Sequence, residues 1–156
     1  MDKTTANGGD GMKGTNRKTW DPVTDKRIQT LHSKVQQHAF DFINDVEAQL
    51  NIKLRVTQAL RTIAEQNTLY AKGRTSPGSI VTNARGGQSY HNYGLAIDVV
   101  EIRGNTVNWN SNWTAIARIS SIHGFTWGGH WATPDKPHFQ MAFGLTIQQL
   151  QNGSTP

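Results

Sequence analysis

An aspartate inside an apolar run, Leu95 to Val100, is the feature that most restricts how this chain can fold. The run has the length of a buried strand, whose alternate residues face opposite sides, so Asp98 shares one side with Ala96. Burying an ionised carboxylate costs several kcal/mol unless a cation, a metal ion or hydrogen-bond donors compensate it. Asp98 is therefore either a buried carboxylate satisfied by backbone or arginine donors, or a metal ligand.

Two histidines make the metal interpretation attractive. His91 lies one glycine-containing turn before Asp98, and His138 opens another short apolar segment. Two histidines and one carboxylate form a three-ligand zinc set that leaves a fourth position for water, as catalytic zinc sites do. The chain has no cysteine, so disulfides and thiolate ligands are excluded and any metal site must use His, Asp or Glu.

The length and the N-terminal composition predict one folded domain. A chain of 156 residues can bury a core of its own. We expect a flexible leader over residues 1–20, a single catalytic domain over 21–153 and a short tail over 154–156. The leader lacks the apolar stretch of a signal peptide, and no segment predicts a membrane span. Synthesis in the cytoplasm, with release by lysis or a dedicated delivery route, is therefore expected.

The net charge of +5 is concentrated in residues 53–90, which hold six basic side chains against one acid, Glu65. A basic surface suits an anionic partner such as nucleic acid or a cell envelope, although a solvated face without a partner explains the charge equally well. The chain has no recognition helix, zinc finger or aromatic-stacking motif, so no nucleic-acid partner is predicted.

Apolar residues at spacings of three and four predict one long amphipathic helix that begins at Asp21-Pro22 and ends near Leu50. His32 and His38 lie on or near this helix without a partner at ligand spacing, and no special role is expected for either. A strand follows over residues 54–60, with Leu54, Val56 and Gln58 expected on one face.

The remaining segments are short elements around one long loop. A capping box at Thr62–Glu65 starts a helix that ends at Gly73. Residues 73–90 are too rich in Gly, Pro, Ser and Asn for a regular element, and such a long loop predicts a wall of a functional cleft. Further elements are expected as a hairpin turning at 104–105, a helix over 113–123, a strand from 125 into a glycine turn, and a helix over 146–151.

Two further residues complete a hydrolytic site in principle. A zinc ion lowers the pKa of a bound water to roughly 7, but hydrolysis also needs a proton acceptor and a cation for the developing oxyanion. Asp135 lies on a proline-rigidified loop three residues before His138, which makes it the candidate general base. Arg61 lies where a strand leads into a helix and is the candidate oxyanion stabiliser; a surface or ion-paired arginine is the alternative.

These motifs resemble a known family. Ser89-x-His91-x-x-Gly94-x-Ala96-x-Asp98 followed by Asp135-x-x-His138 resembles the zinc-dependent D-alanyl-D-alanine carboxypeptidase and dipeptidase superfamily. The longer stretch 80–98, together with residues 61–66, 127–129 and 137–141, is similar to the L-alanyl-D-glutamate peptidase branch. That branch includes phage endolysins and bacterial wall-remodelling enzymes, and the resemblance covers roughly residues 25–153.

The resemblance implies roles for particular residues. Zinc would bind His91, Asp98 and His138, with Asp135 as general acid and base and Arg61 facing the transition state. Substrate contacts are expected from three further residues, Ser89, Gln66 and Trp131. Members of the family often carry an acid where this chain has His130 and an aromatic residue where it has Leu60, and neither difference removes an implied ligand.

The resemblance also implies the fold and the substrate. It implies an α+β fold of the Hedgehog and D-alanyl-D-alanine peptidase type, in which a small antiparallel sheet carries the zinc site and helices cover one face. A monomer would cut the peptide stem of peptidoglycan between L-alanine and D-glutamate. The alternatives are a D,D- or L,D-carboxypeptidase of the same superfamily and a non-catalytic zinc-containing wall-binding module. The setting could be an endolysin, a wall-remodelling enzyme or an antibacterial effector.

Overall fold

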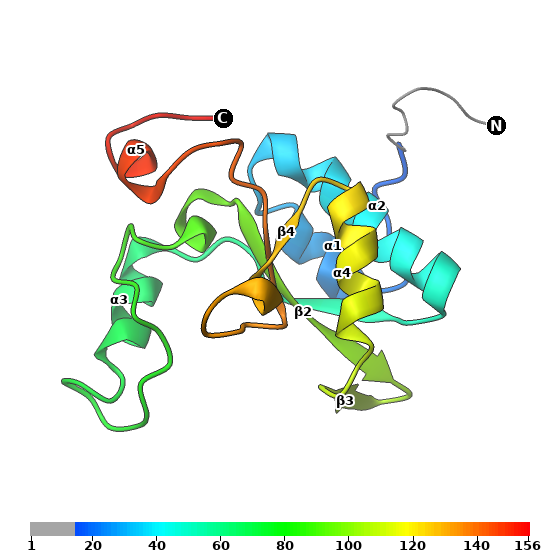
Figure 1. Ribbon diagram of the computed structural model, residues 1–156, viewed down its shortest axis with the longest axis horizontal. Coiled ribbons are helices and arrows are strands. Elements are labelled where there is room, and N and C mark those ends of the chain that lie inside the picture. Colours follow the sequence, from blue (N-terminus) through cyan, green and yellow to red (C-terminus); the bar gives the residue numbers. More distant parts are fainter. Residues whose placement is uncertain (1–14) are drawn as a thin grey trace.

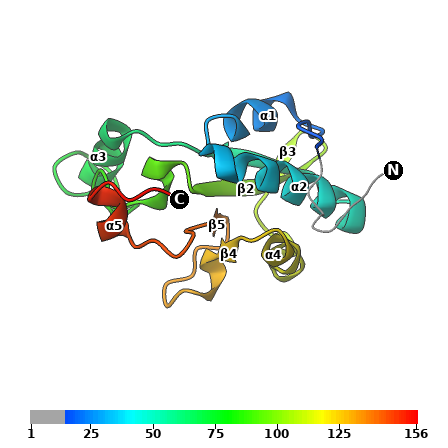
Figure 2. The same ribbon diagram turned by 90° about the horizontal axis from the view of Figure 1, so that it is seen from above.

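The computed structural model describes residues 15–156 and shows an α+β fold. Its sheet is antiparallel, in the order β1-β2-β5-β4, with β3 paired to β2. Helices α1, α2 and α4 pack with the sheet, whereas α3 and α5 lie together at the other end of the molecule (Figures 1 and 2). The strands are β1 (Leu54–Gln58), β2 (Ala96–Arg103), β3 (Thr106–Asn108), β4 (Thr126–Trp127) and β5 (His138–Gln140). The helices are α1 (Pro22–Ile28), α2 (Ser33–Leu50), α3 (Ile63–Ala71), α4 (Trp113–Ile122) and α5 (Ile147–Gln151).

Strand β2 separates the core from the functional face. Ile97 is paired with Phe139 of β5, and both are fully buried in the cluster that contains the helix side chains. Asp98 is paired with His138 on the same two strands. Because neighbouring positions of a strand face opposite sides, this register points Asp98 and His138 away from the core. The predicted alternation along β2 is therefore confirmed.

A β-bulge in β1 corrects the prediction for Gln58. Val56 is paired with Val99, yet Gln58 is paired with Asp98, so Thr57 is the extra residue between them. A bulge shifts the alternation by one position. Gln58 consequently lies opposite Asp98 and lines the cavity there, and it does not share the core face of Val56.

The long N-terminal helix was predicted as one element, and the structure shows two. Helix α1 ends at Ile28, and α2 begins at Ser33 after a reversal of the chain. At the break, the backbone N–H of His32 donates to the carbonyl of Gly94, and the His32 Nδ1 caps α2 by accepting from the N–H of Lys34. A tertiary contact thus replaces a helical hydrogen bond. The apolar spacing continues through the turn, so the sequence pattern does not indicate the break between the helices.

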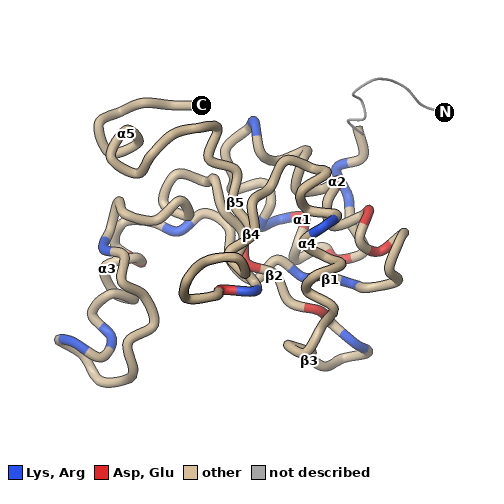
Figure 3. The backbone as a smooth tube through the Cα atoms, in the orientation of Figure 1, with Lys and Arg blue, Asp and Glu red and all other residues tan. Residues whose placement is uncertain are grey.

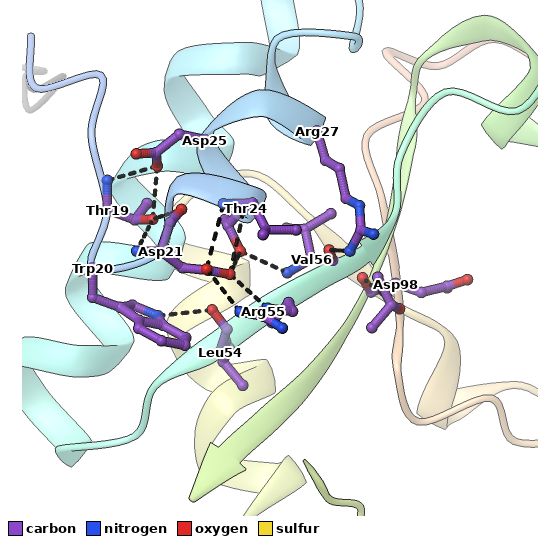
Figure 4. Close-up of polar contacts among 12 residues, drawn as sticks. Thr19, Trp20, Asp21, Thr24, Asp25, Arg27, Leu54, Arg55, Val56 and Asp98 are labelled. Atoms are coloured by element: carbon purple, nitrogen blue, oxygen red, sulfur yellow. Dashed lines mark hydrogen bonds and ion pairs between the residues drawn. The ribbon is translucent and has the colours of Figure 1, made fainter. Parts of the chain in front are cut away.

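An ion pair between a buried carboxylate and a partly exposed guanidinium attaches α1 to β1 (Figure 4). Asp21, only 2% exposed, accepts hydrogen bonds from Nε of Arg55 at 2.8 Å and from Nη2 at 3.0 Å. It also caps α1 and accepts from the hydroxyl of Thr24, whose oxygen in turn accepts from the N–H of Val56. Burial raises the pKa of Asp21, but the hydrogen bonds from Arg55 and Thr24 lower it by a larger amount. The net pKa therefore lies below the usual value.

The last residues of the expected leader, residues 1–20, make contacts with the folded part of the chain. Residues 1–14 lie outside the described part of the chain. Within the described part, the Trp20 indole N–H donates to the Leu54 carbonyl at 3.0 Å, and the Thr19 hydroxyl donates to Asp25 at 2.7 Å. The residues just before 21 therefore belong to the folded unit.

The shorter elements follow the sequence prediction. The capping box of Thr62 and Glu65 starts α3, Asn112 caps α4, and the β2–β3 hairpin turns at Gly104 with a φ of 62°. Thr146 caps α5 through a capping box with Gln149. None of the helices in residues 15–156 combines the length and hydropathy needed to cross a bilayer.

We expect Asp21→Asn to lower the free energy of unfolding by about 2 kcal/mol at pH 7, because it removes a charge-assisted pair and keeps a capping side chain. The folded-state pKa of Asp21 is depressed, so this stabilisation exists above the unfolded value of about 3.9 and is lost as the pH falls through the folded value. Urea denaturation at pH 7 and at acid pH should show the difference between wild type and variant shrinking in acid.

The more exposed pair of Glu47 and Lys53 supplies the control. Glu47→Gln should cost about 1 kcal/mol or less. An Asp21→Asn effect equal to that of Glu47→Gln, or independent of pH, would contradict the assignment.

Candidate active site

Three potential metal ligands converge on the face of the sheet opposite the core. His91 comes from the 3₁₀ helix η3 (Tyr90–Tyr93), Asp98 from β2 and His138 from β5. One ligand atom from each residue can be chosen so that all three lie within 4.8 Å of one another. The structure therefore brings together the three residues that the sequence assigned to zinc.

The turn that carries His91 is shaped by its neighbours. The Ser89 hydroxyl caps η3 by accepting from the His91 N–H, and Gly94 ends η3 with a φ of 70°. A Cβ on Gly94 would lie 2.6 Å from the backbone nitrogen of His32. Only glycine therefore allows the turn to pack this closely against the start of α2.

His91 has one ring nitrogen committed and one without a partner. Its Nδ1–H donates to the Ala59 carbonyl at 2.8 Å, which leaves Nε2 with a lone pair. This Nε2 is buried, has no hydrogen-bond partner among the described residues, and lies 3.4 Å from the Asp98 carboxylate. A buried lone pair that faces a carboxylate oxygen is repelled by it unless a cation lies between them.

His138 is arranged in the same way. Its Nε2–H donates to the Gln140 side-chain oxygen at 2.8 Å, so Nδ1 presents a lone pair 3.2 Å from Asp98. With both imidazoles neutral, the centre of the cluster is surrounded by acceptors alone. Two nitrogens and a carboxylate are a donor set that zinc accepts, and the three residues therefore fit a catalytic zinc ion.

The pKa values show that the cluster attracts positive charge. When protons on the inner imidazole nitrogens take the place of a metal ion, the histidines become donors: burial raises the pKa of Asp98, but the hydrogen bonds and charges of His138 and His91 in that form hold it well below its usual range. Burial lowers the pKa of His138, yet the hydrogen bond and charge of Asp98 raise it above the ordinary value. A bound metal ion would replace the proton as the source of this positive charge.

A cavity of about 630 Å³ opens at this cluster. One wall is the loop before His91, as the sequence predicted, and Ser89 and Trp131 are among the lining residues. The Trp131 ring, 44% exposed, lies 5.0 Å from the ring of His138. His130 instead stacks edge-on against Trp127 and is not among the residues that line the cavity.

Asp135 reaches the cavity from its loop through a close approach to Gly128. The Asp135 N–H donates to the Gly128 carbonyl at 2.9 Å, and a Cβ on Gly128 would lie 2.7 Å from the Asp135 carbonyl oxygen. Within residues 15–156, the Asp135 carboxylate accepts no hydrogen bond and forms no ion pair. Burial and the charge of Asp98 raise its pKa, with partial offset from the two histidines and Arg61. Asp135 thus has the properties of a proton acceptor.

Arg61 lies beside the metal cluster and is held by Gln66. Its Nη2 is 3.8 Å from the Asp98 carboxylate, and its Nη1 donates to the Gln66 side-chain oxygen at 2.9 Å. Gln66 is fully buried and is not among the cavity-lining residues, and its amide donates to the Ala84 carbonyl at 2.8 Å. Gln66, which was expected to contact the substrate, therefore lies beneath the cavity. There it holds the guanidinium of Arg61 and the cavity loop.

Sequence reasoning missed the residues that orient the ligands. Gln140 could have been found, because it lies two positions after His138 on a strand and must share its face. The Ala59 carbonyl carries no sequence signal, since every residue has one. The role of Gly128 depends on a loop approach that only the folded backbone reveals.

Comparison with known proteins agrees with this geometry. The family model described as D-alanyl-D-alanine carboxypeptidase matches residues 82–141. The peptidoglycan L-alanyl-D-glutamate endopeptidase CwlK of Bacillus subtilis is 42% identical over 124 residues, which cover 71% of this chain and 73% of that protein. This chain belongs to the D-alanyl-D-alanine carboxypeptidase family. The family match includes the three cluster residues and Asp135 but not Arg61.

Solved structures show the same fold at lower identity. The L-Ala D-Glu endopeptidase ChiX of Serratia marcescens has a TM-score of 0.59 and 23% identity, and the match covers 78% of this chain and 88% of that one. The vancomycin-resistance D,D-pentapeptidase VanY, in complex with Zn(II), has a TM-score of 0.56 and 16% identity, with coverage of 78% and 84%. The predicted α+β fold of the D-alanyl-D-alanine carboxypeptidase family is confirmed.

We expect Gln140→Leu to weaken zinc binding by about 10- to 100-fold, because the His138 ring loses the acceptor that orients it. Competition titration against a chromogenic chelator measures the affinity directly. Gln140→Glu, which keeps an acceptor, should bind zinc at least as tightly as the parent.

Gln58→Leu is the matched control for this prediction. Gln58 also lines the cavity, but it contacts Arg61 and no ligand ring. Its replacement should leave zinc affinity unchanged. Equal affinities in Gln140→Leu and the parent protein would show that Gln140 does not orient His138.

Proposed function

We propose that this protein is a zinc endopeptidase that hydrolyses the peptide stem of peptidoglycan at the bond between L-alanine and D-glutamate. The observation that carries the proposal is the acceptor-only cluster of His91, Asp98 and His138, which opens on a cavity beside Asp135 and Arg61. The bond assignment is supported by the identity to CwlK. Family membership supports the reaction class.

The proposed chemistry divides among the residues of the cavity. When bound, zinc would supply a Lewis acid that polarises the scissile carbonyl and activates water. The Asp135 carboxylate takes a proton from the attacking water and returns it to the D-glutamate nitrogen as the C–N bond breaks. The Arg61 guanidinium, fixed by Gln66, donates to the oxygen on which negative charge develops. Trp131 and Ser89 form walls that position the peptide.

Two other functions share this site. A carboxypeptidase is favoured by the description of the family model and by the likeness to VanY in fold. A non-catalytic zinc-containing wall-binding module would have no use for Asp135, whose carboxylate is held at the cavity without a hydrogen bond in the described chain. The free Asp135 therefore favours an enzyme.

The proposal includes the setting of the enzyme. It acts on the wall side of the cell as a monomer, with residues 21–153 and the contacts just before them as the catalytic unit. Lysis or a dedicated delivery route would bring it there. Size-exclusion chromatography with light scattering tests the monomer, and a dimer at micromolar concentration would contradict it.

Digestion of a defined muropeptide tests the reaction. Mass spectrometry should find a fragment with a new D-glutamate amino terminus, and a chelator should abolish its formation until zinc is restored. Loss of terminal D-alanine alone would assign the protein to the carboxypeptidases. Absence of any cleavage by the zinc-loaded protein would leave the wall-binding module as the function.

Asp135→Asn should reduce the rate by about 10²- to 10⁴-fold, the usual contribution of a general base, while zinc content stays at the wild-type level. Metal analysis and muropeptide turnover measure the two quantities on one preparation. Glu47→Gln, a carboxylate-to-amide change on the remote helix α2, should retain full activity. Wild-type turnover in Asp135→Asn would remove this residue from the mechanism.

A further inference from the structure

A group of basic side chains lies at the outer end of the cavity, away from the metal cluster. The cavity extends from His91 to Leu69 of α3 and to Val81, Thr82 and Ala84 of the loop. Lys72, Arg74 and Arg85, here called the basic rim, are exposed beside these lining residues. Figure 3 shows basic residues in the loop that follows α3 and beside the helix, where acidic residues are few.

Arg74 forms the rigid part of the basic rim. Its guanidinium lies 3.8 Å from the centre of the Tyr70 ring and donates to the Tyr70 carbonyl at 2.6 Å. It also donates to the Thr82 carbonyl at 3.0 Å and to the Asn83 side-chain oxygen at 3.1 Å. Since Thr82 lines the cavity, these bonds fix the basic rim to the cavity wall.

Arg85 lies on the same tyrosine with its donors uncommitted. Its guanidinium is 5.1 Å from the Tyr70 ring centre, and it follows Ala84, which lines the cavity. In the described part of the chain, neither Arg85 nor Lys72 makes a side-chain hydrogen bond or ion pair. All N–H donors of both side chains are therefore available to a ligand.

The charge of the basic rim is not neutralised locally. Two guanidinium groups share the Tyr70 ring, and like charges held together repel. Glu65 is the only acid in residues 53–90, and its carboxylate is committed to the capping box of α3. An anion that bridges the rim would relieve the repulsion and engage the free donors.

We propose that Arg85, beside Arg74 on the Tyr70 ring, forms a subsite for a free carboxylate of the bound stem peptide. This inference rests on the proposed function, which makes the stem the substrate. L-alanine is joined to the glycan through its amino group and carries no charge, whereas D-glutamate, linked through its side chain, keeps a free α-carboxylate. The D-glutamate α-carboxylate is two bonds from the scissile nitrogen and lies close to the metal cluster, so the more distant basic rim binds a carboxylate further along the same side of the stem. This contact sets the direction of the peptide in the cavity.

Kinetics on paired substrates tests the subsite. The substrates are two soluble stem peptides, one with free carboxylates and one with the same groups as carboxamides. Arg85→Gln should raise KM about tenfold for the free carboxylate peptide, the worth of one charge-assisted contact, with kcat unchanged. The amidated peptide should show no change. Peptides amidated only at D-glutamate or only at the third residue identify which carboxylate is bound.

Arg118→Gln is the matched control, because Arg118 is an exposed arginine on α4, remote from α3 (Figure 1). It should leave both substrates unaffected. An equal loss on both peptides in Arg85→Gln, or no loss on either, would overturn the subsite. A loss confined to intact walls that carry phosphate polymers, with soluble stems unaffected, would also overturn it and assign the basic rim to a polyphosphate.

Equilibrium binding separates this inference from the proposed function. Calorimetry with zinc-loaded Asp135→Asn measures peptide affinity without turnover. If the wild-type protein cleaves neither peptide, the proposed function fails, yet tighter binding of the free carboxylate peptide that is lost on Arg85→Gln still supports the subsite. Equal affinity for the two peptides would refute it independently of catalysis.

Discussion

The pairing of Asp98 with His138 across β2 and β5 is the constraint on which the site depends. It places a carboxylate and an imidazole lone pair within hydrogen-bond distance, and η3 adds the lone pair of His91. Three acceptors held this close are unstable together unless a cation joins them. Because the three acceptors repel one another in the absence of a cation, the arrangement favours binding of a metal ion.

The surrounding structure keeps that arrangement rigid. Ala59 and Gln140 accept the outer N–H of each imidazole and so select the tautomer that faces the centre. Gln66 orients Arg61 in a similar way, because it accepts from the Arg61 guanidinium and donates to the Ala84 carbonyl of the cavity loop. Preorganised groups of this kind lose little entropy when the reaction begins, and the buried polar partners beneath the cavity provide this preorganisation.

Much of the fold was predictable because local signals agreed with it. The capping box before α3, the alternation along β2 and the glycine turn of the β2–β3 hairpin were all read correctly. Two predictions failed where a distant contact overrode a local pattern. The break before α2 depends on the Gly94 carbonyl, and the reversal of Gln58 depends on a bulge opposite Asp98. The spacing of apolar residues along one segment carries no information about a contact with a distant segment.

The sequence alone determined the ligand types, the absence of thiolates and the candidate proton acceptor, because these follow from residue chemistry and short spacings. Folding decided the placement of Gln66 beneath the cavity, the fit of Gly128 against the loop of Asp135, and the shared contact of Arg74 and Arg85 with Tyr70. The physical reason is the same in each case. Burial, close backbone approach and charge pairing depend on distances between segments far apart in the chain, and those distances exist only after the sheet and helices have packed.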